Sequence, residues 1–74
     1  MMDVMVDAII QVNGKTEALS AARLAALLAD KGIDADARGV AVALNGAVVP
    51  RTAWAETQLR AGDAVEIVRA KQGG

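Results

Sequence analysis

The sequence predicts an α+β fold in which one main helix packs on one face of a mixed five-stranded sheet. Three features support this prediction: two alternating apolar runs that each end at an Asn-Gly pair, one amphipathic segment between them, and a third alternating run near the C-terminus. Period-two alternation is typical of strands, and Asn-Gly is typical of tight hairpin turns. The third run has no hairpin partner of its own, so we expect it to join the same sheet.

The first hairpin is predicted over residues 4–19. Every even position from 4 to 12 is apolar, which indicates a strand. Asn13-Gly14 supplies two residues that tolerate positive φ, and residues 15–19 then return antiparallel.

The main helix is predicted over residues 21–31. Ser20 precedes it as the expected N-cap, and the leucines of the segment fall on one face. Gly32 is expected to end the helix at the C′ position. Leu28 and Ile33 would then make the apolar contact that accompanies a Schellman motif.

The second half predicts another hairpin and a closing strand. Residues 40–44 alternate up to Asn45-Gly46, and Pro50 limits the return strand to a short segment or to a sheet edge, because proline cannot donate to a ladder. Residues 64–68 are the closing strand, with Val65 and Ile67 pointing inward.

A short segment before the closing strand completes the pattern. Thr52 is expected to cap one irregular or helical turn, from which Trp54 and Leu59 fold back onto the core. The order of elements is strand, strand, helix, strand, strand, short helical turn and strand. This is the β-grasp arrangement of ubiquitin-like domains.

Composition limits the kind of function. A chain of 74 residues forms a single domain, residues 1–74. It contains neither cysteine nor histidine, so no side-chain nucleophile, metal site or disulfide is expected. The eight basic residues are scattered and the net charge is -1, which offers no nucleic-acid footprint. With no signal peptide and no membrane segment predicted, we expect a cytoplasmic protein.

The segment 70–74, AKQGG, is predicted to be a flexible tail. Five extended residues reach about 16 Å, enough to enter a partner's active site, and glycines approach a nucleotide without a Cβ. The reactive group would be the carboxylate of Gly74, which needs activation, for example by joining to AMP. A sulfur nucleophile would then give a thiocarboxylate, and an amine would give an isopeptide. A merely frayed terminus is the alternative.

Residues 9–74 resemble the ThiS family, the sulfur carriers of thiamine biosynthesis. The resemblance rests on one ordered set of short motifs: Asn45-Gly46, Val49-Pro50-Arg51, Trp54, Gly62-Asp63, Glu66-Ile67-Val68 and Gly73-Gly74. Residues 1–7 precede the usual start of the family, as an extension of the first strand or the result of an upstream start site. Lys71-Gln72 is more polar than the small apolar residues often found before the terminal glycines.

The resemblance implies that Gly74 is adenylated by an E1-like, ThiF-type enzyme and converted to a thiocarboxylate that gives its sulfur to thiazole synthase. A sulfur-donating enzyme is a third partner. Gly73, Gln72, Lys71 and Ala70 would enter the partner's active site. The chain would then be a cosubstrate and not an enzyme, a monomer when free, with ATP used by the partner and no cofactor bound.

Other functions remain open on the sequence. The small subunit of molybdopterin synthase shares the implied fold, tail and activation chemistry, and carriers of other sulfur pathways resemble it as well. A ubiquitin-like modifier or a plain interaction domain is the alternative from a different class.

An exposed apolar patch on the open face of the sheet would favour docking. Val68 and Ile9 are the apolar docking candidates, together with Arg69. Arg51, Arg60, Arg69 and Lys71 could pair with an acidic partner surface, and solvated surface charge is the alternative. Asn45-Gly46 and Gly62-Asp63 are predicted to serve turn geometry. Trp54 is predicted to cover the core.

Overall fold

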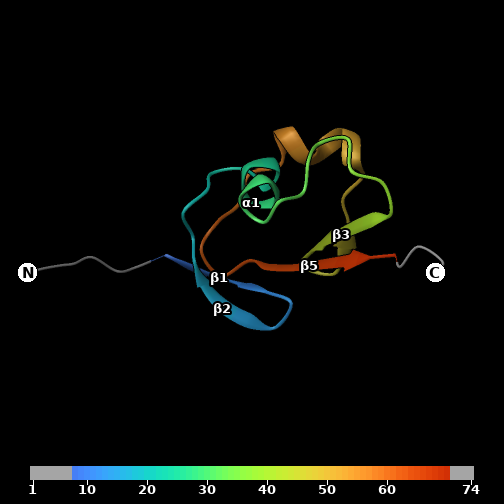
Figure 1. Cartoon of the computed structure of the whole chain (residues 1–74). Helices are drawn as coiled ribbons and strands as arrows, with labels where there is room; N and C mark the ends of the chain where they lie inside the picture. Colours follow the sequence, from blue (N-terminus) through green and yellow to red (C-terminus); the bar gives the residue numbers. More distant parts are fainter. Residues whose placement is uncertain (1–7, 71–74) are drawn as a thin grey trace, which may run out of the picture.

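The computed structural model describes residues 8–70 and leaves residues 1–7 and 71–74 outside the description. Figure 1 shows the elements in chain order. Their bounds are β1 Ile9–Val12, β2 Lys15–Ala18, α1 Leu24–Asp30, β3 Val40–Leu44, β4 Ala47–Val48, the 3-10 helix η1 Arg51–Glu56 and β5 Ala64–Arg69.

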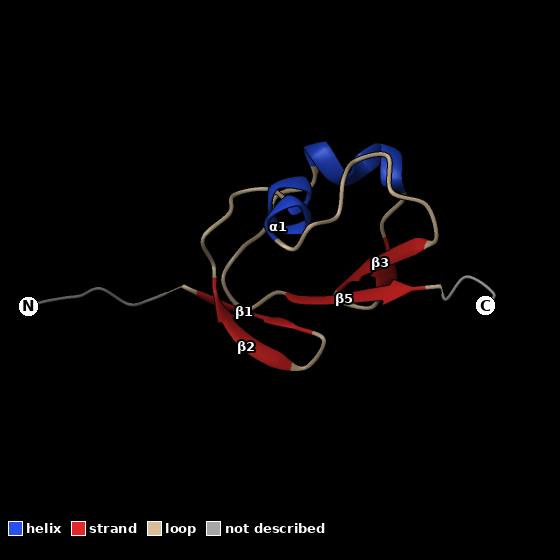
Figure 2. Ribbon diagram, viewed as in Figure 1, coloured by secondary structure: helices blue, strands red, loops and turns tan. Residues whose placement is uncertain are grey.

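Within residues 8–70 the strands form one five-stranded sheet in the order β2-β1-β5-β3-β4. The two outer pairs are hairpins, β5 runs parallel to β1, and β5 runs antiparallel to β3. Both helices lie on the same side of this sheet, and the opposite side is left open (Figure 2). The predicted mixed sheet with one main helix, a β-grasp arrangement, is confirmed.

The first hairpin is confirmed in its described part. Ile9 pairs with Ala18 and Val12 with Lys15, so the two-residue turn lies at Asn13-Gly14. Ile10 and Val12 are buried, as the alternation predicts. Ala8 precedes the strand, and the predicted residues 4–7 lie outside the described part of the chain.

The start of the main helix was predicted wrongly. α1 begins at Leu24, and its N-cap is Arg23, with no side-chain cap from Ser20 or any other residue of the described chain. Arg23 is held extended by an isolated bridge to Gln58. The Leu24 N–H donates to the Thr57 carbonyl at 2.8 Å. A backbone carbonyl from a distant segment therefore takes the place of a local cap.

The end of the helix follows the prediction in detail. Gly32 has φ +81°, and its N–H donates to the Ala29 carbonyl at 3.0 Å. The Ile33 N–H donates to the Leu28 carbonyl at 2.8 Å, and both side chains are buried. These two bonds define a Schellman motif with its apolar contact.

The second hairpin has a short return strand at the edge, as Pro50 predicts. β4 has two residues and is the outermost strand beside β3. The following turn is 3-10 and is preceded by Pro50, so Thr52 is not its cap. Proline already has the fixed φ that such a start requires, and it has no N–H to leave unsatisfied.

The core lies between the sheet and the helices. Trp54 is 2% exposed, and its indole N–H donates to the Val49 carbonyl at 3.0 Å, which confirms Trp54 as a core residue. Leu59 is buried and Ile67 packs against the core. The buried set is aliphatic apart from Trp54, namely Ile10, Val12, Ala21, Leu24, Leu27, Leu28, Ile33, Val42, Leu59 and Val65.

Candidate functional site

The candidate site is the end of β5, from which the chain continues toward Gly74. β5 is the central strand of the sheet, paired with β1 on one side and β3 on the other. Val40 pairs with Arg69, and beyond the strand the Ala70 N–H donates to the Gly39 carbonyl at 2.6 Å. The point at which the tail leaves the domain is therefore fixed by the sheet.

Asn13 fixes β5 from the side of the first hairpin. β1 is parallel to β5 only as far as Val12, after which the chain turns away. Asn13 adopts φ +52°, its N–H donates to the Val65 carbonyl at 2.9 Å, and its side-chain Oδ1 accepts the Ile67 N–H at 2.8 Å. The side chain thus continues the ladder where the backbone of β1 no longer can.

Asn45 fixes the start of β5 from the side of the second hairpin. Its Oδ1 accepts the Ala64 N–H at 2.9 Å, and its amide nitrogen donates to Asp63 Oδ1 at 3.0 Å. Asp63 Oδ2 also accepts the Arg60 N–H at 2.8 Å. The motifs Asn45-Gly46 and Gly62-Asp63 therefore contact each other, and their predicted turn roles are confirmed.

An apolar patch lies beside the end of β5 on the open face of the sheet. We call it the tail-root patch and define it as Ala41, Ala43, Val48 and Val68. Val68 pairs with Ala41 and Val48 with Ala43, so alternation places all four on the face opposite the core. Val68 is 62% exposed and Val48 is 76% exposed. Exposed large aliphatic side chains on one open face favour a binding surface.

Val48 is the residue of this patch that sequence reasoning missed. The signal was present, because Val42 points inward and the two-residue turn at Asn45-Gly46 pairs Ala43 with Val48. A residue opposite the outward-facing Ala43 must itself face outward.

The other two docking candidates do not share the tail-root patch. Ile9 is 48% exposed on the open face, but it lies beside Gly62, whose N–H donates to the Ile9 carbonyl at 2.7 Å. Gly62 is six residues before Val68, so the two side chains are roughly 20 Å apart along the sheet. Arg69 faces the helix side instead, where its guanidinium donates to the Lys31 carbonyl at 3.4 Å.

The remaining predicted site residues are only partly within the described chain. Ala70 is described and exposed, directly after β5. Lys71, Gln72, Gly73 and Gly74 lie outside the described residues. Their predicted entry into a partner's active site stays a prediction.

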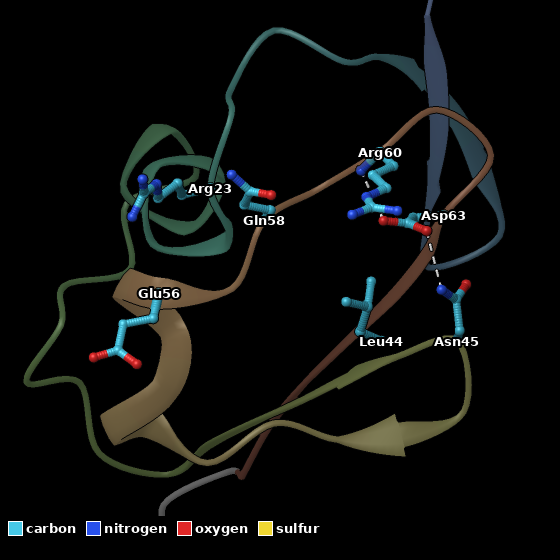
Figure 3. A pocket seen from close by; sticks show the side chains of 7 residues that line it. All are labelled: Arg23, Leu44, Asn45, Glu56, Gln58, Arg60 and Asp63. Carbon is cyan, nitrogen blue, oxygen red and sulfur yellow. Dashed lines mark hydrogen bonds between the residues drawn. The ribbon is translucent and has the colours of Figure 1, made fainter.

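A hollow lies near the start of β5, at the opposite end of this strand from the tail-root patch (Figure 3). It is lined by Arg23, Leu44, Asn45, Glu56, Gln58, Arg60 and Asp63. Its lining holds two arginines and two acidic residues, and the Asn45–Asp63 contact within it already anchors β5. Asn45 and Asp63 in this hollow therefore have a structural role in the fold, and the hollow lies far from the tail.

Residues 8–70 contain no group of three or more acidic, histidine or cysteine side chains placed to hold a metal ion. In the same range no helix has the length and apolar character needed to cross a bilayer.

The fold and the site define a class: a small β-grasp domain that holds the root of a C-terminal segment at the end of its central strand. The family model that matches this chain is that of the ThiS family, over residues 7–74. The chain therefore belongs to the ThiS family. Membership in this family supports a role as a sulfur carrier that is acted on by enzymes of thiamine biosynthesis.

A solved structure supports the same family membership. The chain is similar to the thiamine biosynthesis protein (ThiS) from Geobacter metallireducens, with 36% sequence identity and a TM-score of 0.71. The match covers 89% of this chain and 99% of that one. The comparison with curated proteins gives no significant match.

Proposed function

We propose that this protein carries sulfur for thiazole formation in thiamine biosynthesis, as a thiocarboxylate on Gly74. The observation that carries the proposal is the ThiS family match over residues 7–74, which extends to the last glycine. The similarity to a thiamine biosynthesis protein over nearly the whole of both chains supports the choice of pathway.

The chemistry proceeds on the carboxylate in two steps. A carboxylate oxygen of Gly74 attacks the α-phosphorus of ATP, pyrophosphate leaves, and an acyl adenylate forms. Sulfide delivered by its donor then attacks the carbonyl carbon, the C–O bond to AMP breaks, AMP leaves, and the sulfur remains on the protein as the thiocarboxylate. The E1-like, ThiF-type enzyme binds the ATP, and a sulfur-donating enzyme supplies the sulfur.

When thiazole synthase takes the sulfur, the carbonyl carbon of Gly74 gains an oxygen from water or from the substrate, and the Gly74 carboxylate is regenerated. The protein is thus a cosubstrate that is consumed and restored, which suits a chain with no cysteine and no histidine. We place this cycle in the cytoplasm, with the free carrier as a monomer. No cofactor bound by this chain is required.

In the described structure, one part of the domain presents the tail and another is suited to contact the partner. The sheet fixes Ala70 by its bond to the Gly39 carbonyl, so the domain presents the tail from a defined point. The tail-root patch lies next to this point and is suited to hold the partner's surface while Gly74 reaches about 13 Å beyond it.

The proposal is tested by intact-mass measurement. The protein is incubated with ATP, a ThiF-type enzyme and a sulfur source, and the expected product has one sulfur in place of one C-terminal oxygen. A matched control variant that lacks Gly74 should show no mass change after the same incubation. Its thermal unfolding should stay nearly the same as that of the intact chain. An unchanged mass of the intact chain with its cognate activating enzyme would contradict the proposal.

A further inference from the structure

The charges of this domain are balanced in number but not in placement. Residues 8–70 hold seven basic and seven acidic side chains. Three hollows surround the end of β5, and their linings include five of those seven bases but only one acid, Glu17. We call these five residues the cationic rim; they are Lys15, Lys31, Arg38, Arg51 and Arg69.

The first part of the rim lies in a groove between the first hairpin and the end of α1. Lys31 Nζ is 2.8 Å and 2.9 Å from the two carboxylate oxygens of Glu17, so this acid is already paired. Arg69 donates to the Lys31 carbonyl, which sets its guanidinium at the same groove. The backbone of Lys15 pairs with Val12, but its side chain makes no hydrogen bond or ion pair within residues 8–70. The groove therefore carries an excess of positive charge.

The second part lies on the other side of the point where the chain leaves the sheet. Arg38 directly precedes Gly39, whose carbonyl holds the Ala70 N–H. Arg51 donates to the carbonyls of Asp36 and Ala37 at 3.4 Å and 3.1 Å, which fixes it against the same loop. These bonds use neutral acceptors, so the guanidinium charge is not compensated there.

Nearby acids do not cancel this excess inside the hollows. Asp34 and Asp36 are exposed on the loop before Arg38, but neither lines any of the three hollows. Glu66 is exposed on the open face of the sheet and lines none of them either. The positive side chains therefore surround the root of the tail on the helix side, while the tail-root patch adjoins it on the open face.

We propose that the cationic rim binds an acidic surface around the active-site entrance of the activating enzyme. This inference rests on the proposed function, because that enzyme must receive the tail. Long-range attraction would orient the domain before the tail-root patch makes contact, so the rim acts chiefly on the association rate. A nucleic acid is a poorer occupant, since the net charge is -1 and the one aromatic residue, Trp54, is buried.

Two charge-reversal variants with identical net charge test the inference. Lys15→Glu with Arg38→Glu reverses the two rim residues whose side chains make no hydrogen bond or ion pair within residues 8–70. Arg23→Glu with Arg60→Glu makes the same change in formal charge at the opposite end of the sheet, in the hollow of Figure 3. Thermal unfolding of both variants checks that each is folded.

The measurement is the association rate with the cognate ThiF-type enzyme at low and at high salt. We expect the rim variant to associate about tenfold or more slowly at low salt and to lose most of the salt dependence. The control variant should stay within about twofold of the wild type. Equal slowing of the two variants would show that only net charge matters and would overturn the inference.

The same samples separate this inference from the proposed function. If the wild type acquires its sulfur but the rim variant associates as fast as the control, the acidic docking surface is refuted and the carrier role stands. If the wild type neither binds the enzyme nor gains sulfur, both are refuted. A rim variant that associates slowly but reaches the full mass change after long incubation supports both.

Discussion

The contact between Asn13 and β5 leads to a quantitative prediction about how the tail is held. In Asn13→Ala the Ile67 N–H loses its 2.8 Å acceptor, which costs about 1 kcal/mol at an exposed site. The same change places alanine at φ +52°, which costs about 1 to 2 kcal/mol more because its Cβ crowds the backbone there. The expected loss in the free energy of unfolding is therefore about 2 to 3 kcal/mol.

Asn13→Asp is the matched comparison. Aspartate keeps an oxygen acceptor at the same position and tolerates positive φ, so its loss should stay below about 0.5 kcal/mol. Urea unfolding monitored by Trp54 fluorescence gives both values, because that side chain is 2% exposed in the folded domain. Amide exchange at Ile67 gives the local effect, which should accelerate in the alanine variant far more than in the aspartate variant.

An equal loss of stability in the two variants, or an equal response of amide exchange at Ile67, would show that the Asn13 side chain does not hold β5 in this way. A loss below about 0.5 kcal/mol in Asn13→Ala would show that water replaces the side chain without cost. The expected result instead ties the first hairpin turn directly to the strand that leads into the tail.

Three further predictions concern other parts of the fold. Trp54→Phe should cost about 1 kcal/mol or more in unfolding free energy, because the hydrogen bond to the Val49 carbonyl is lost. Trp54→Ala should cost about 3 to 5 kcal/mol. Urea unfolding followed by circular dichroism measures both values. Gly32→Ala should lower the unfolding free energy by about 1 kcal/mol because φ is +81°, although no atom lies within 4 Å of the added Cβ. Gly32→Asn should cost less, because asparagine tolerates this conformation better. Equal losses in the two variants would contradict the conformational explanation. Glu17→Gln should cost less than about 0.5 kcal/mol, since the side chains of Glu17 and Lys31 are 33% and 30% exposed, and the difference from the wild type should vanish in 1 M salt, as thermal unfolding would show.

Local signals in the sequence predicted most of the fold. The strands follow from alternation, both hairpin turns from Asn-Gly pairs, and the helix end from Gly32 with its flanking apolar residues. Each of these features depends on residues within a few positions of one another. Pro50 likewise predicted a short edge strand because its missing N–H acts locally.

The wrong helix start came from contacts between distant segments, whereas the wrong cap at Thr52 came from the neighbouring Pro50. Ser20 has the right residue type for an N-cap, but the Thr57 carbonyl and the Arg23–Gln58 bridge fix the helix start at Leu24. No pattern near residue 20 contains that information. The failure of local capping rules here reflects tertiary structure that overrides local preference.

The candidate site could be predicted only in part for the same reason. Val68 was placed correctly on the open face by alternation, and the same rule applied across the second turn would have added Val48. The separation of Ile9 from Val68 depends on the parallel pairing of β1 with β5, which the sequence does not specify. The grouping of Lys15, Arg38 and Arg69 around the tail root likewise appears only after folding.

A sulfur carrier must both accept sulfur and transfer it to an acceptor. A single-turnover reaction tests this most directly: the carrier is loaded with isotopically labelled sulfur, separated from the donor, and mixed with thiazole synthase and its other substrates. If the protein is a sulfur carrier, the label will appear in the thiazole product while the protein returns to the mass of its carboxylate form. Label that stays on the protein, or thiazole formed without label, would contradict it.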